Sequence, residues 1–158
     1  MYIKLIYTLL MLISTEIMSS SYPGPDLSRG SDPVRMCTCT PEYDVFTSVA
    51  TKALQEIIDE RKSIHKQLIR SITFLREHMP NLPLGRLISL HKRFTCALKQ
   101  RLDSTLEVTK HFKSSILRFP VLLQDRWVQE LLEDIEKELG RQAELYSLIR
   151  AFKLIPGR

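Results

Sequence analysis

Residues 84–118 read LGRLISLHKRFTCALKQRLDSTLEVTKHFKSSILR. Apolar side chains recur there every three or four residues, as on one face of an α-helix, at Leu87, Leu90, Phe94, Leu98, Leu102, Leu106, Phe112 and Ile116. Ser104-Thr105-Leu106-Glu107 has the form of a capping box, which would start a new helix near Asp103. Because neither Pro nor Gly accompanies this motif and the apolar spacing continues through it, we predict one continuous helix, with a break near Asp103 as the alternative.

Two further helical patterns flank this stretch. The first begins at Thr40-Pro41, a favourable helix start, and ends at Pro80; its apolar residues are Phe46, Ala50, Ala53, Ile57, Ile64, Leu68, Ile72, Leu75 and Met79. The third follows Phe119-Pro120 and ends at Pro156-Gly157, with Leu122, Val128, Leu132, Ile135, Leu139, Ala143, Tyr146, Ile149 and Phe152. Each pattern covers about 35 residues and the connections are short. The sequence therefore predicts an all-α fold, an elongated up-down bundle of three long antiparallel helices, or of four if the second helix breaks.

Two segments precede the bundle. In residues 1–21, Lys4 is followed by the apolar run Leu5–Ile13, which is shorter than the roughly 20 residues that span a bilayer and is typical of a signal peptide. We predict cleavage after Ser21 and a secreted, extracellular protein. Residues 22–40 are rich in Pro, Gly and Ser and predict a flexible arm. The bundle domain is then expected over residues 41–155, followed by a C-terminal tail over 156–158.

The net charge of +5 comes from the central pattern. Residues 84–118 contain eight basic and two acidic side chains, whereas residues 121–155 contain five basic and seven acidic ones. Such a surface attracts acidic partners: a cell-surface receptor, another acidic protein, a sulfated glycan or a lipid headgroup. The candidate partner-binding residues are Arg86, Lys92, Arg93, Lys99, Lys110 and Lys113. The alternative is a solvated face, partly neutralised by the acidic third helix. Nucleic acid is not expected, since no zinc-finger or RNP-like motif occurs.

A second candidate surface lies near the start of the third pattern. Leu123, Trp127 and Leu131 form an apolar strip beside the main stripe. Trp is enriched in the residues that dominate binding at interfaces, so this strip is a candidate partner-binding site. The alternative is that it widens the contact of the helix with the core.

The sequence contains three cysteines, Cys37, Cys39 and Cys96, an odd number for a secreted protein. A bridge from Cys37 or Cys39 to Cys96 would tie the arm to the bundle. Antiparallel packing, however, places Cys96 about 30 Å along the axis from residue 42, and five residues from Cys37 span at most about 18 Å. We therefore expect Cys96 to be an inert buried thiol. Cys37 and Cys39 would then face a partner, most simply a second copy in a disulfide-linked homodimer.

Motifs of catalysis are missing from the sequence. It has no Gly-x-Ser-x-Gly, Gly-x-Gly-x-x-Gly, Walker loop or His-Glu-x-x-His. The carboxylates of the third pattern are expected to form a solvated face. Cys-x-Cys alone supplies too few ligands for structural zinc. We therefore expect a non-enzymatic protein with no catalytic residue, no metal and no cofactor.

A signal peptide, a helical bundle, few cysteines and no catalytic motif together resemble helical cytokines and hormones at the level of fold class. The resemblance implies an extracellular ligand that binds a receptor or an acidic partner through helix surfaces. The alternative is an apolipoprotein-like protein that binds lipid or a membrane surface, because long basic amphipathic helices suit that role if the bundle opens. Phe46, Phe94, Phe112 and Tyr146 favour a fixed core, and so the ligand hypothesis.

Overall fold

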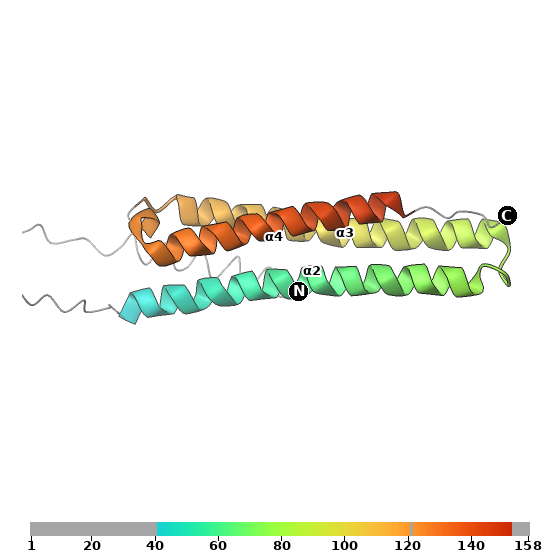
Figure 1. The fold of residues 1–158 in the computed structure, drawn as a ribbon, viewed down its shortest axis with the longest axis horizontal. Coiled ribbons are helices and arrows are strands. Elements are labelled where there is room, and N and C mark those ends of the chain that lie inside the picture. Colours follow the sequence, from blue (N-terminus) through green and yellow to red (C-terminus); the bar gives the residue numbers. More distant parts are fainter. Residues whose placement is uncertain (1–40, 121, 153–158) are drawn as a thin grey trace, which may run out of the picture. The chain divides into compact units, whose positions relative to one another are not determined.

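The structure is a computed structural model that describes residues 41–120 and 122–152. These residues form helix α2 (Pro41–His78), helix α3 (Leu84–Leu117), a short 3-10 turn η1 (Leu122–Gln124) and helix α4 (Arg126–Ala151), shown in Figure 1. No strand occurs among the described residues. The protein is thus an all-α three-helix bundle, as predicted. The predicted signal peptide, the arm with Cys37 and Cys39, and the C-terminal tail lie outside the described residues.

Helix α3 is continuous through Asp103, as we predicted, and the four-helix alternative is wrong. Within the apparent capping box, the hydroxyl of Thr105 donates to the carbonyl oxygen of Arg101 at 2.9 Å. That contact joins residues four apart inside a helix and does not cap the start of one. Thr105 is buried, so this side chain belongs to the interior of the bundle.

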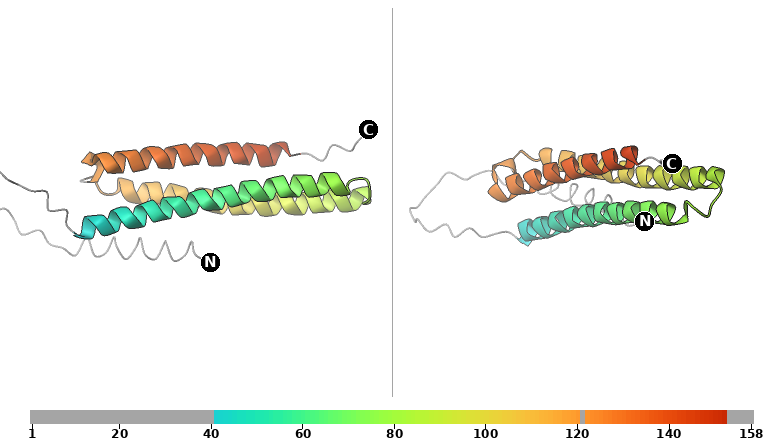
Figure 2. Two further views of the ribbon diagram at one scale, coloured as in Figure 1. Left: turned by 60° about the horizontal axis from the view of Figure 1, so that its bottom comes forward. Right: turned by 45° about the vertical axis from the view of Figure 1, so that its right-hand side comes forward.

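The chain divides into two compact units between Ala53 and Leu54, and the helix packing described below is that of residues 54–152. Contacts between α2 and α3 join Phe74 to Phe94 and Glu60 to Arg101. The residue number rises along one helix as it falls along the other, so α2 and α3 are antiparallel. Helices α3 and α4 also run antiparallel, side by side (Figures 1 and 2).

The core of this unit draws on all three helices. One buried cluster joins Ile64 and Leu68 of α2 with Leu98 and Leu102 of α3 and with two residues of α4, Leu145 and Ile149. Burying side chains of this size stabilises a fold by about 1.5–3 kcal/mol each before the entropic cost of ordering them. The cluster therefore holds the bundle together near its middle.

The buried face of α4 differs from the predicted one. The structure buries positions spaced alternately by three and four residues: Val128, Leu131, Ile135, Glu138, Gln142, Leu145 and Ile149. The predicted positions Leu132, Leu139 and Tyr146 are only partly buried and Ala143 is exposed. The spacing is that of helices packed knobs-into-holes. The prediction was correct for Val128, Ile135 and Ile149. It missed Leu131 and Leu145 as well as the polar Glu138 and Gln142, because it followed a stripe of apolar residues to one side of this face.

Helix α4 is also shorter than predicted, with 26 residues against 38 in α2 and 34 in α3. Pro120 follows the end of α3, the turn η1 comes next, and the carboxylate of Asp125 accepts a hydrogen bond from the backbone N–H of Trp127 at 2.8 Å. Asp125 is therefore the N-cap of α4, a role that suits Asp because it satisfies an unpaired donor of the first turn. The estimate of about 35 residues counted η1 and the cap as helix.

Candidate functional site

The predicted basic residues of α3 differ in how far they are available to a partner. Arg86, Lys92, Arg93 and Lys110 are exposed, and none forms an ion pair with a residue that the structure describes. Lys113 is partly buried and pairs with Glu136 of α4. Four of the six candidates are therefore uncommitted cations, and Lys113 belongs in part to the α3–α4 contact.

These cations lie along both edges of the solvent-facing side of α3. At 3.6 residues per turn, Lys92, Lys99 and Lys110 share one edge, because they are separated by seven and eleven residues. Arg86 and Arg93, seven residues apart, share the other edge. From residue 86 to residue 110 the helix rises about 36 Å. The side chains thus make a long, broad basic surface, which we call the α3 basic face: Arg86, Lys92, Arg93, Lys99 and Lys110.

Lys99 has a specific neighbour on α4. Its ammonium Nζ lies 5.6 Å from the centre of the Tyr146 ring, within the range of a cation–π interaction. The Tyr146 side chain and, to a smaller extent, the nearby Asp103 carboxylate raise the pKa of Lys99 above its ordinary value of 10.5. Lys99 therefore stays positively charged throughout the physiological range of pH.

Arg101 is basic but belongs to the helix contacts. Its guanidinium forms an ion pair with Glu60 of α2 at 2.7 Å, Nη2 to Oε1, and a second hydrogen bond from Nε to the same oxygen at 3.0 Å. It also donates to the side chains of Ser63 and Gln67. One basic residue of α3 outside the candidate set is thus neutralised within the bundle, by α2 and not by the acidic third helix.

The predicted strip of Leu123, Trp127 and Leu131 is not one exposed surface. Leu131 lies in the core with 6% of its surface exposed, so its assignment as a partner-binding residue is wrong. Leu123, in η1, and Trp127, in the first turn of α4, are partly buried. Within the strip, Leu131 therefore belongs to the core of the bundle.

Cys96 is exposed and free in the structure, so the prediction of an inert buried thiol is wrong. The prediction rested on its apolar neighbours Phe94 and Leu98. A separation of two residues, however, is a rotation of about 200° around a helix. Cys96 therefore lies on the side of α3 away from the core, between the two edges of the α3 basic face.

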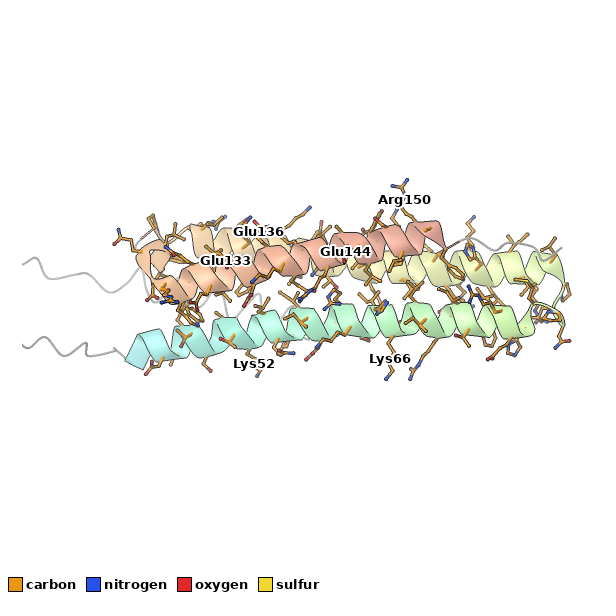
Figure 3. The ribbon with its side chains drawn as sticks, viewed as in Figure 1. Lys52, Lys66, Glu133, Glu136, Glu144 and Arg150 are labelled. Carbon is orange, nitrogen blue, oxygen red and sulfur yellow. The ribbon has the colours of Figure 1, made fainter. Side chains whose placement is uncertain are left out.

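A polar layer inside the bundle was missed by the sequence analysis. Glu138 of α4 has no exposed surface, and its Oε1 lies 2.6 Å from Nε of Arg61 on α2. Its other oxygen, Oε2, forms no hydrogen bond and lies 3.8 Å from the guanidinium of Arg141. One turn further along α4, the buried amide of Gln142 donates to the Thr109 hydroxyl of α3 at 2.9 Å. The expectation of a solvated carboxylate face is wrong for Glu138. It holds for the exposed Glu133 and Glu144, which Figure 3 shows on the outside of α4.

This polar layer is better suited to fixing how the helices pair than to catalysis or metal binding. Its one carboxylate faces two guanidinium groups, which have no proton to exchange at physiological pH. No group of three or more His, Cys, Asp or Glu side chains is placed to hold a metal ion among the described residues. The signal for the layer was the 3-4 spacing itself, which points to Glu138 and Gln142 once polar residues are allowed at core positions.

No helix within the described ranges has both the length and the hydropathy needed to cross a membrane. Comparison of the chain with protein-family profiles, curated proteins and solved structures finds no match.

Proposed function

We propose that this protein is a secreted, non-enzymatic ligand, similar in fold class to helical cytokines and hormones, which binds an acidic partner through the α3 basic face. The observation that carries the proposal is a set of exposed cations on one helix that form no ion pair with described residues: Arg86, Lys92, Arg93 and Lys110. A surface with uncompensated charge attracts an oppositely charged partner and speeds its association. The partner is the acidic surface of a receptor or a sulfated glycan.

The α3 basic face also holds few charges that the bundle itself uses. Arg101 and Lys113, the two α3 cations committed to ion pairs with other helices, lie at the flanks that face α2 and α4. Lys99 also contacts Tyr146 of α4. The other cations of the α3 basic face are not part of these helix contacts. These exposed cations are available to bind a partner.

The buried polar layer disfavours the apolipoprotein-like alternative. Lipid binding of that kind requires the bundle to open and to lay its inner helix faces against acyl chains. The inner face of α4 includes Glu138 and Gln142, and Arg61 of α2 contacts it. Moving a carboxylate, an amide and a guanidinium from mutual contact into hydrocarbon is costly. A closed bundle acting through its outer surface fits these residues better.

The proposal is tested by comparing two variants with equal net charge on a heparin column. The first carries Lys92→Glu, Arg93→Glu and Lys110→Glu on the α3 basic face. The matched control carries Lys52→Glu, Lys66→Glu and Arg70→Glu on α2, at exposed positions without ion pairs to described residues; Figure 3 labels Lys52 and Lys66. Each variant changes the net charge by the same amount, so any difference in retention reports the location of the binding surface.

We expect the α3 variant to elute at clearly lower salt than the parent protein. It has fewer cations that attract heparin, so less salt is needed to screen the attraction that remains. The control should elute close to the parent. Equal loss in both variants would mean that net charge alone governs retention and would contradict the proposal. Recovery of the protein from cells and not from their medium would contradict its secretion.

A further inference from the structure

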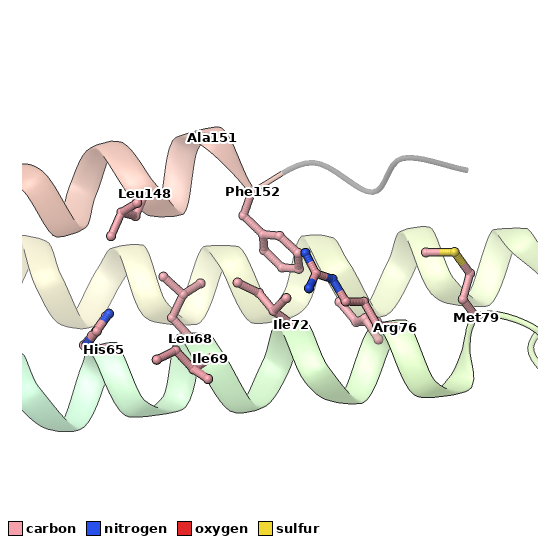
Figure 4. A pocket seen from close by; sticks show the side chains of 10 residues that line it. His65, Leu68, Ile69, Ile72, Arg76, Met79, Leu148, Ala151 and Phe152 are labelled. Atoms are coloured by element: carbon pink, nitrogen blue, oxygen red, sulfur yellow. The ribbon is translucent and has the colours of Figure 1, made fainter. Parts of the chain in front are cut away.

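A groove between α2 and α4 lies apart from the α3 basic face. It has a volume of about 500 Å³ and is lined by the last four turns of α2 and the last turn of α4 (Figure 4). Leu68 and Leu75 line it as buried side chains, whereas Ile69 of α2 and Leu148 of α4 are each 52% exposed. Two large aliphatic side chains, one from each helix, thus border the groove and are open to solvent.

The end of α4 explains why this groove is open. Helix α4 ends at Ala151, and Phe152 lies against His91 of α3, with the His91 Nε2 atom 2.8 Å from the Phe152 carbonyl oxygen. The groove lining continues beyond Ile72 through Leu75 and Arg76 of α2 to Met79, the first residue after that helix. The apolar edge of α2 is therefore longer than the part of α4 that covers it.

The charge in the lining is that of a cation. Arg76 is its charged residue, and no carboxylate is among the lining residues. The Arg76 side chain forms no ion pair with another described residue. An apolar wall beside a guanidinium that pairs with no described carboxylate favours a ligand that offers both apolar side chains and a carboxylate.

We propose that this groove binds an acidic amphipathic helix of a partner protein. Amphipathic helices bind grooves between helices through apolar residues spaced at i, i+3 or i+4, and i+7. The lining extends from His65 of α2 to Met79, just after the end of that helix, about 21 Å, which corresponds to a helix of about 14 residues. Acidic residues beside its apolar stripe would pair with Arg76. This second surface does not depend on binding at the α3 basic face.

The test uses a designed probe. It is a fluorescein-labelled helical peptide of about 14 residues with Leu along one face and Glu and Gln elsewhere, and its control has Lys in place of each Glu. Binding is followed by anisotropy with the protein purified from cells that express the full chain. We expect saturable binding of the Glu peptide, and binding of the Lys peptide that is weaker by about tenfold or more.

Two isoleucines provide a matched pair of variants. Ile69 borders the groove, whereas Ile88 of α3 is outside its lining, and each is 52% exposed. Ile69→Glu should weaken binding of the Glu peptide by about tenfold or more, and Ile88→Glu should leave it unchanged. Arg76→Gln should reduce the difference in affinity between the Glu peptide and the Lys peptide. Both isoleucines are half exposed, so the variants are expected to fold, and circular dichroism checks this.

Several results would overturn the proposal. One is no saturable binding of the Glu peptide; another is equal binding of both peptides, or equal losses in Ile69→Glu and Ile88→Glu. Self-association in sedimentation that Ile69→Glu abolishes would identify a second copy of this chain as the occupant. Displacement of the peptide by phosphatidylcholine vesicles would identify acyl chains as the occupant. None of these results depends on heparin retention by the α3 basic face.

Discussion

The guanidinium of Arg61 on α2 lies 2.6 Å from the fully buried carboxylate of Glu138 on α4. Such a pair adds little net stability, because removing both charges from water costs about as much as their attraction returns. Sliding α4 along α2 by one turn, however, would separate them and leave a carboxylate buried without a partner. We infer that this pair fixes the register of α4 against α2.

Removing one member of the pair is therefore more harmful than removing both. Arg61→Met should lower the free energy of unfolding by about 3–5 kcal/mol, because it leaves Glu138 with only the more distant Arg141. The double variant Arg61→Met, Glu138→Leu should be near the parent protein or above it. Urea unfolding followed by circular dichroism measures the free energy of unfolding of the parent protein, of Arg61→Met and of the double variant. A double variant as unstable as Arg61→Met would show that the pair itself supplies stability.

The cap of α4 gives a second prediction. Asp125→Ala removes the acceptor for the Trp127 N–H and should destabilise the protein by about 1 kcal/mol. Asp125→Asn keeps a side-chain acceptor at the same place and should recover most of the loss. Thermal unfolding of both variants measures this. Equal midpoints for the Ala and Asn variants would contradict the capping role.

The raised pKa of Lys99 predicts a dependence on pH. Because the folded-state pKa lies above the unfolded one, the contribution of this contact to stability is fully present below the ordinary pKa of 10.5. It is lost as the pH rises through the folded-state pKa. Tyr146→Phe removes the phenol but keeps the ring, so the pKa of Lys99 should fall toward its ordinary value. NMR titration of the Lys99 side chain measures the shift; an unchanged pKa would contradict the assigned cause.

Exposure of Cys96 predicts that its thiol reacts in the folded protein. Iodoacetamide at neutral pH should label Cys96 without denaturant, at a rate near that of an exposed thiol in a peptide. Peptide mapping by mass spectrometry separates this site from Cys37 and Cys39. Labelling of Cys96 only in denaturant would restore the buried position that the sequence analysis favoured.

The sequence predicted the number of helices correctly for a physical reason. Pro80 and Pro120 interrupt helices strongly, and the apolar spacing between them is maintained through the whole of α3. The candidate cations came from the charge count of residues 84–118, and the structure exposes Lys92, Arg93 and Lys110 among them.

The interior was less predictable. Glu138 and Gln142 occupy core positions because partners on other helices, Arg61 and Thr109, satisfy them there. The 3-4 spacing points to both positions, but it does not reveal a partner such as Arg61, which is 77 positions from Glu138 in the sequence. The groove escaped prediction for a related reason, because it depends on where α4 ends relative to α2. The polar contacts and the groove both depend on how the helices are arranged in three dimensions.

Chemical-shift mapping with a heparin hexasaccharide tests the central claim most directly, because it reports both where the acidic ligand binds and whether the bundle stays closed. The account predicts perturbed backbone and side-chain resonances at Arg86, Lys92, Arg93 and Lys110. The side-chain resonances of Arg61 and Gln142, inside the bundle, should remain unchanged. Perturbation centred on α2 or α4, or loss of the Arg61 and Gln142 resonances as the ligand binds, would contradict a closed bundle that binds through α3.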